Sequence, residues 1–150
     1  MAFIERTLFD SDHEIFRDTV RRFVEEEIAP YHAQWEKDGM ISREAWLKAG
    51  KLGLLCASMP EEYGGGGVDR TYSIVLLEEL ARAGATGPGF GLHSEIVAPY
   101  INRYGSEEQK RKFLTKMATG ESIGAIAMTE PGTGSDLQGV RTTALKGGNE

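Results

Sequence analysis

Apolar side chains recur every three or four residues through most of the first 120 positions of this 150-residue chain. That period places them on one face of an α-helix, because a strand would alternate apolar and polar positions instead. The first such stripe runs from Ile15 to Ile28, behind possible N-caps at Asp10 and Asp12, and we expect Pro30 to end it. The periodicity therefore predicts a mainly α fold.

Four further helical segments follow, each bounded by a capping residue or a glycine. The expected ranges are 42–53, 69–83, 93–104 and 106–120. The last of them opens with Ser-Glu-Glu-Gln, which is the pattern of a capping box. Between the first two lies a loop, residues 60–67, whose four consecutive glycines are too flexible to continue a helix.

The pattern changes after Gly120. Residues 122–129 form a short apolar run bounded by turn residues, which predicts a buried strand, and residues 140–145 predict a second one. We interpret residues 146–149 as the turn of a hairpin whose return strand is missing. Because two strands without partners do not make a stable sheet, we expect this sequence to be the front part of a longer protein.

Composition and charge exclude several classes of protein. The formal net charge of −6 argues against a nucleic-acid binder, which needs a basic surface to neutralise phosphates. The single cysteine, Cys56, rules out an internal disulfide framework. No apolar run approaches the ~20 residues of a membrane span, and the N-terminus lacks a secretory signal. We therefore expect a cytoplasmic protein, or a mitochondrial-matrix protein if the source is eukaryotic.

Common ligand-binding motifs are also missing. Neither the G-x-G-x-x-G fingerprint nor the P-loop pattern occurs in the sequence. His13, His32 and His93 lie far apart and in no metal-binding pattern, so we expect no metal site. A lone histidine on an apolar helix face, such as His93, is typical of a hydrogen-bonded packing residue.

The most informative stretch is residues 125–139, which read AIAMTEPGTGSDLQG. A strand there would run into a loop rich in glycine, hydroxyl groups and exposed backbone N–H groups. Such a loop can approach a flat, polar-edged ligand closely and donate hydrogen bonds to its oxygens and nitrogens. The alternative, an ordinary strand–turn–strand connection, stays open from these residues alone.

Four motifs are spread along nearly the whole chain: Met59–Gly66, Leu77–Ala81, Tyr104–Lys110 and Met128–Asp136, the last reading MTEPGTGSD. In order and spacing they resemble motifs of the acyl-CoA dehydrogenase family, the flavoenzymes that oxidise fatty acyl-CoA thioesters. Three further stretches look most similar to the long-chain branch of that family: Phe16–Lys37, Gly87–Ser94 and Ile123–Thr129.

The resemblance implies a fold for each part of the chain. Residues 1–120 would form the family's N-terminal helical domain, and residues 121–150 the first strands of its middle β-barrel domain, truncated here. The family's C-terminal four-helix bundle would be absent. Since the main oligomer contacts of the family use that bundle, a homotetramer would assemble through the missing part.

The resemblance also implies FAD as the cofactor. In the family, a strand and loop contact the flavin, and the matching residues here are Ile126, Ala127, Met128, Thr129, Gly134 and Ser135. Backbone groups and the threonine hydroxyl would face the edge of the isoalloxazine ring, while Ser135 would lie near the FAD phosphates and the substrate's pantetheine. Hydrogen bonds there would stabilise the negative charge that builds on the ring during hydride transfer. Glu130 is expected to fix the loop.

A second implied site is the pocket for the acyl chain of the acyl-CoA substrate. Its lining would include Pro88, Gly89, Phe90, Leu92, His93 and Ile96. Gly89 and Gly91 remove side-chain volume, which would permit a deep pocket and a long chain. A glycine-rich helix start with no ligand nearby is the alternative.

The family's reaction needs more than this chain contains. It is the α,β-dehydrogenation of medium- or long-chain acyl-CoA in fatty-acid β-oxidation: a carboxylate base removes the α proton, the β hydride passes to flavin N5, and the electrons leave to an electron-transfer flavoprotein. The base would lie beyond Glu150, so we expect no catalytic residue here and no activity from this chain alone. Two other interpretations stay open: an acyl-CoA oxidase of the same fold, and a non-catalytic helical interaction module derived from it.

Overall fold

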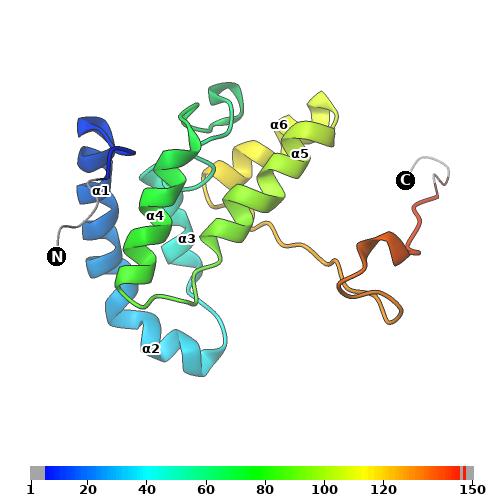
Figure 1. Cartoon of the computed structure of the whole chain (residues 1–150), viewed down its shortest axis with the longest axis horizontal. Coiled ribbons are helices and arrows are strands. Elements are labelled where there is room, and N and C mark those ends of the chain that lie inside the picture. Colours follow the sequence, from blue (N-terminus) through cyan, green and yellow to red (C-terminus); the bar gives the residue numbers. More distant parts are fainter. Residues whose placement is uncertain (1–5, 146, 148–150) are drawn as a thin grey trace.

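The computed structural model describes residues 6–145 and 147, and the regular elements among them are helices, which confirms the mainly α prediction. Near the N-terminus, α1 (Ser11–Phe23), the π-helical turn η1 (Val24–Ile28) and α2 (Ala29–Asp38) follow one another without a break. Figure 1 shows α2 turning away from the axis of α1.

The prediction that Pro30 ends the first helix is wrong. Pro30 lies in the first turn of α2, where backbone N–H groups have no intrahelical partner, so its missing N–H costs no hydrogen bond. The helix ends instead at Gly39, which adopts a left-handed conformation with φ of +70°. Because the π-helical turn η1 interrupts the α-helical hydrogen-bond pattern, α2 begins anew at Ala29, and Pro30 fits in its first turn.

In the described chain, three of the remaining four α-helices start at a capping residue that the sequence indicates, Ser42, Asp69 or Ser106, and the fourth continues directly from a π-helical turn. Ser42 Oγ accepts a hydrogen bond from the Ala45 N–H at 3.2 Å, and Ser106 and Gln109 form the expected capping box. The later elements are α3 (Arg43–Lys51), the 3₁₀ turn η2 (Glu61–Tyr63), α4 (Arg70–Arg82), the π-helical η3 (Leu92–Val97), α5 (Ala98–Tyr104), α6 (Glu107–Ala118) and the 3₁₀ turn η4 (Leu137–Gly139).

Helices α1 and α4 lie side by side (Figure 1). Between them, the carboxylate of Glu79 is 4% exposed and accepts hydrogen bonds from Arg21 at 3.0 Å and from Arg17 at 3.2 Å. Hydrogen bonds from Arg21 and then Arg17 hold the pKa of Glu79 below its usual range, against the opposing effect of burial. Two cations of α1 therefore satisfy one buried anion of α4.

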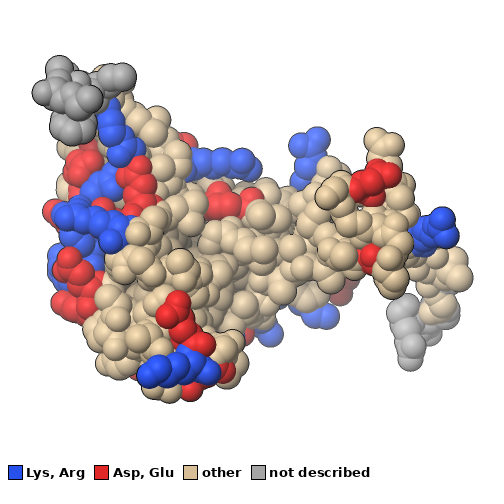
Figure 2. Space-filling model, turned by 60° about the horizontal axis from the view of Figure 1, so that its bottom comes forward, with Lys and Arg blue, Asp and Glu red and all other residues tan. Residues whose placement is uncertain are grey.

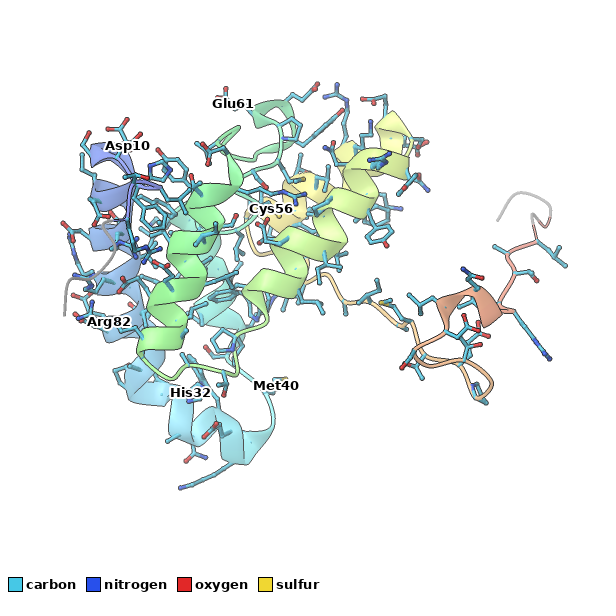
Figure 3. All side chains as sticks on the ribbon, viewed as in Figure 1. Asp10, His32, Met40, Cys56, Glu61 and Arg82 are labelled. Carbon is cyan, nitrogen blue, oxygen red and sulfur yellow. The ribbon has the colours of Figure 1, made fainter. Side chains whose placement is uncertain are left out.

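The hydrophobic core joins α1, α3 and α4 with the chain that enters η3. Phe90 is fully buried, and its ring meets the ring of Trp46 edge-on with centroids 4.7 Å apart. A second cluster forms around Cys56, Leu114 and Met117 at the α5–α6 side. Figure 3 shows Cys56 inside the helical part of the molecule, between these elements.

Glycines allow the end of α6 to approach α3 backbone to backbone. A Cβ atom on Gly50 would lie 2.2 Å from the carbonyl carbon of Thr119, closer than any real contact. Gly120 follows with φ of +76°, and a Cβ there would lie 2.3 Å from the carbonyl oxygen of Trp46. The end of α6 is therefore fixed against α3 before the chain leaves the helices.

Beyond Gly120 the described chain is extended and leaves the helical part of the molecule (Figure 1). The strands predicted over 122–129 and 140–145 are not formed among the described residues, where the only pairing is an isolated bridge between Glu130 and Thr133. A strand needs a neighbouring strand to pair its backbone hydrogen bonds, and no strand within residues 6–145 and 147 pairs with these segments. Most of the turn predicted over 146–149 lies outside the described residues.

Charge is unevenly distributed over the surface. Figure 2 shows Lys, Arg, Asp and Glu side chains gathered at the α1 edge, and a broad area of other residues across the middle of the same face. Across residues 6–145 and 147, no helix is both long and apolar enough to cross a membrane.

Candidate functional site

The loop that follows the extended segment is closed by Glu130. Its backbone N–H and C=O each pair with Thr133 at 3.0 Å, which makes a tight turn across Pro131 and Gly132. The Glu130 carboxylate then reaches the far side of the loop, where one oxygen accepts the Arg141 N–H and the other the Thr142 N–H, both at 2.9 Å. This confirms that Glu130 holds the loop.

The same hydrogen bonds decide the protonation of Glu130. Its contact with Thr142, followed by the one with Arg141, lowers the pKa of the carboxyl below its ordinary value. The group is therefore ionised at neutral pH, with both oxygens engaged by backbone donors. Such a carboxylate is poorly suited to act as a general base, as the sequence analysis expects.

Two more residues shape the inside of the loop. Asp136 caps the turn η4 by accepting the Gln138 N–H at 3.1 Å. Thr133 is 5% exposed, and its hydroxyl has no hydrogen-bond partner within the described chain. A Cβ on Gly139 would lie 2.9 Å from that hydroxyl oxygen, so the glycine allows close packing of Thr133 under the loop.

An open pocket of about 520 Å³ lies between the extended segment and the returning arm of the loop. Its lining consists of Ala127, Met128, Thr129, Glu130, Leu137, Val140 and Thr142. The structure thus brings three of the six residues predicted to contact the flavin into one concave surface. Ile126 precedes this surface, and Gly134 and Ser135 lie exposed on the loop outside its lining.

The extended segment offers free backbone donors. Residues 125–129 are all exposed, and within the described chain none of their N–H groups donates a hydrogen bond. Thr129 adds an exposed hydroxyl to this row. A row of unpaired N–H groups beside a pocket fits a flat ligand with acceptor atoms on its edge, which is the shape of a flavin ring.

The residues predicted to line an acyl-chain pocket separate into two layers. Leu92 and Ile96 are 40% and 42% exposed, and a Cβ on Gly89 would meet nothing within 4 Å. In contrast, Phe90 and His93 are fully buried. Pro88 is buried too. The three exposed residues can contact a ligand, whereas the buried three form the layer behind them.

Gly91 has a different use from Gly89. A Cβ on Gly91 would lie 2.9 Å from a methyl carbon of Leu77, so its missing side chain is filled by α4 and not by open space. The same pair of elements is joined by the Ser73 hydroxyl, which donates to the Glu95 carboxylate at 2.6 Å. Gly91 therefore serves the packing of η3 against α4.

His93 is a hydrogen-bonded packing residue, one of the two interpretations that the sequence allowed. Its Nδ1 accepts the Gly124 N–H at 2.9 Å, and its Nε2 lies 3.1 Å from the Met117 carbonyl oxygen, to which it donates. Burial lowers the pKa of the imidazole, so the ring is neutral at pH 7. The link to Gly124 has no signal in the sequence, because no local pattern connects residues 31 positions apart.

No group of three or more His, Cys, Asp or Glu side chains in the described ranges could hold a metal ion. The pocket beside the loop has glycine-rich, hydroxyl and backbone groups around it, which suit an organic ligand with polar edges. The family model described as acyl-CoA dehydrogenase, N-terminal domain, matches residues 10–121.

The chain belongs to the acyl-CoA dehydrogenase family. It is 57% identical over 145 residues to the mitochondrial long-chain specific acyl-CoA dehydrogenase of Sus scrofa, an alignment that covers 97% of this chain and 34% of that protein. The chain therefore spans about a third of the length of this curated relative.

Solved structures of the family share the fold. An acyl-CoA dehydrogenase from Geobacillus kaustophilus matches with a TM-score of 0.89 and 49% identity, over 96% of this chain and 38% of that one. An acyl-CoA dehydrogenase from Bacillus anthracis, solved in complex with FAD, matches with a TM-score of 0.81 and 38% identity, over 91% of this chain and 26% of that one.

Proposed function

We propose that this chain is the N-terminal part of an FAD-dependent dehydrogenase of medium- or long-chain acyl-CoA thioesters. The observation that carries the proposal is the exposed segment 125–129, whose N–H groups have no partner in the described chain and which lies beside the pocket. A solved member of the family carries FAD. Residues 1–120 form the helical domain and residues 121–150 open the β domain. The family match ends at residue 121, where the extended chain begins.

The extended segment and its loop hold the cofactor. When bound, FAD would supply the acceptor for a hydride from the substrate's β carbon. Backbone groups of the segment Ile126–Met128 and the Thr129 hydroxyl face the ring edge, where their hydrogen bonds stabilise added negative charge. On the exposed loop, Gly134 contacts the flavin, and Ser135 lies near the FAD phosphates and the substrate's pantetheine. Glu130 keeps the two arms of the loop together while these contacts form.

The exposed layer of the second site contacts the acyl chain. Leu92 and Ile96 offer apolar surface, and Gly89 leaves open space beside it. Pro88, Phe90 and His93 support this layer from the core. The similarity to a long-chain specific relative favours medium or long chains over short ones.

The rest of the reaction belongs to parts that lie outside these 150 residues. A carboxylate base in a C-terminal helical bundle removes the α proton, and an electron-transfer flavoprotein takes the electrons from the enzyme. The same bundle joins the subunits of a homotetramer. The enzyme works in fatty-acid β-oxidation, in the mitochondrial matrix of a eukaryote or the cytoplasm of a bacterium.

The first test is the intact mass and flavin content of the protein isolated from its natural source. A mass well above that of 150 residues, with one FAD per subunit, supports the proposal. A mass equal to that of this chain, without flavin, contradicts it and favours a non-catalytic interaction module.

Replacement of a loop serine tests the assigned site. In the complete protein, Ser135→Ala should weaken FAD or acyl-CoA binding about tenfold, because one hydrogen bond to a charged group is lost. Thr143→Ala is the matched control, since Thr143 also carries an exposed hydroxyl but is not one of the residues assigned to the cofactor or the substrate. Unchanged FAD retention together with an unchanged KM for acyl-CoA would remove Ser135 from the site.

A further inference from the structure

A series of hydrogen bonds anchors the chain between α6 and the extended segment. The Arg43 side chain donates to the Glu121 carbonyl, and the Ser122 N–H donates to the Lys116 carbonyl at 2.9 Å. The final bond of the series is the one from the Gly124 N–H to His93 Nδ1, at 2.9 Å. In the described chain, the next backbone N–H to find a partner is that of Glu130.

Gly124 is therefore the fixed end of the span that carries the candidate flavin contacts. Close packing holds it as well, because a Cβ on Gly124 would lie 2.8 Å from Met117 Cε and 2.9 Å from Val97 Cγ1. Only one residue, Ala125, separates Gly124 from Ile126. A shift of Gly124 would pass to the donors of residues 126–129, since no other described backbone bond restrains them.

The imidazole of His93 is itself held on several sides. It is fully buried in the π-helical η3, it donates from Nε2 to the Met117 carbonyl, and the ring of Trp46 packs against it with centroids 5.1 Å apart. A proton on Nε2 leaves Nδ1 as an acceptor, which is the role that the Gly124 N–H requires. A π turn within a helix often marks a functional site, and here it carries this histidine.

We propose that His93 is a positioning residue for the flavin-contacting segment. Its Nδ1 fixes the point at which residues 125–129 leave the helical domain, and so it sets where their donors meet the flavin edge. The inference rests on the proposed function of that segment. It gives His93 a task distinct from lining an acyl-chain pocket, which its complete burial does not allow in this structure.

Two amide substitutions separate the two hydrogen bonds of the ring. In His93→Asn, the amide oxygen can occupy the place of Nδ1 and keep the bond from the Gly124 N–H. In His93→Gln, the amide nitrogen can occupy the place of Nε2 and keep the bond to the Met117 carbonyl, while the acceptor for Gly124 is lost. Both side chains leave part of the ring's volume unfilled, and Asn leaves more than Gln. A packing loss alone would therefore weaken FAD binding more in His93→Asn, which is the opposite of the order expected here.

The experiment uses the complete protein and measures two quantities for each variant. The first is the dissociation constant of FAD, by titration of the apoprotein. We expect about tenfold weaker binding for His93→Gln than for His93→Asn, which is the effect of one hydrogen bond. The second is hydrogen exchange at the Gly124 amide of the apoprotein, which should be about tenfold faster in His93→Gln than in His93→Asn. Equal values for the two variants in both measurements would overturn the inference.

A backbone variant covers the case in which a substitution at His93 prevents folding. In this variant, the backbone N–H of Gly124 is replaced by an ester oxygen. The replacement removes the donor but leaves His93 and its hydrogen bond to Met117 in place. FAD should then bind about tenfold more weakly, and unchanged affinity would contradict the positioning role. A wild-type protein that binds no FAD would contradict the proposed function instead. The hydrogen-exchange rates at the Gly124 amide do not depend on FAD, so they test the bond to His93 separately.

Discussion

Cys56 combines features that are unusual for a residue other than glycine. Its φ is +54°, and its N–H donates to the Ser94 hydroxyl at 2.9 Å. Its thiol lies 3.7 Å from His93 Nε2 in the second core cluster. This left-handed conformation turns the chain within the buried apolar stretch Leu54–Met59, and the hydrogen bond to Ser94 in η3 stabilises it. Cys56 is therefore a structural residue and not a nucleophile.

The Cys56 thiol should be inert in the folded protein. Burial raises the pKa of the thiol to about 12, so almost no thiolate exists at pH 8, and the side chain is fully buried. We expect a disulfide reagent at pH 8 to label Cys56 only as the protein unfolds, with a labelling curve that follows the urea unfolding curve. Rapid labelling without denaturant would show that the thiol is accessible.

At the scale of helices, the pairing of α1 with α4 depends on the buried carboxylate of Glu79. In the complete protein, Glu79→Gln should lower the free energy of unfolding by about 1–3 kcal/mol, because Arg17 and Arg21 lose a buried charged acceptor, while Arg17 keeps its ion pair with Glu78 at 2.9 Å. Glu25→Gln is the control, since Glu25 is exposed on η1. A urea midpoint equal to that of the control would contradict the role of Glu79.

The same pair gives the stability a definite pH dependence. The pKa of Glu79 is lowered in the folded state, so the unfolded chain binds the proton more readily. The stabilisation is therefore complete above the unfolded pKa, near 4.5, and is lost as the pH falls below it through the lower folded value. In Glu79→Gln this part of the acid sensitivity should be missing.

Helix starts could be predicted from the sequence because their signals are local. Asp10, Ser42 and Ser106 cap the elements that follow them, as their neighbours in the sequence indicate. Pro30 misled the prediction because it lies after a π turn that no short pattern marks. The bond between His93 and Gly124 joins distant positions, so periodicity could indicate burial of the histidine but not its partner.

At the scale of the whole molecule, the chain is a helical body with an extended segment fixed at Gly124 (Figure 1). The two predicted strands, residues 122–129 and 140–145, are not paired, because no strand partner for them is among the described residues. Local sequence patterns indicate that a segment favours a strand but not whether a partner is present. The loop contacts of Glu130 are formed nonetheless, since they lie within residues 130–142. The two candidate ligand surfaces are therefore carried by different parts of the molecule, one by the segment after Gly124 and one by the helices.

A larger side chain at Gly89 tests the acyl-chain surface. Because a Cβ there meets nothing within 4 Å, Gly89→Leu should fold normally and fill open space. In the complete protein, we expect kcat/KM to shift in favour of shorter acyl-CoA substrates. For the longest chains, kcat/KM should fall about tenfold, which corresponds to a loss of about 1–2 kcal/mol in binding free energy. Gly89→Ala is the milder control, and an unaltered profile for Gly89→Leu would remove this segment from the pocket.

The central claim is that this chain supplies the flavin-binding segment of an acyl-CoA dehydrogenase. The most direct test is an anaerobic titration of the isolated complete protein with a long-chain acyl-CoA, followed by the visible absorbance of its flavin. We predict that the oxidised flavin band disappears in proportion to the substrate added. A flavin band that stays unchanged at excess substrate, or a protein that carries no flavin, would contradict the account.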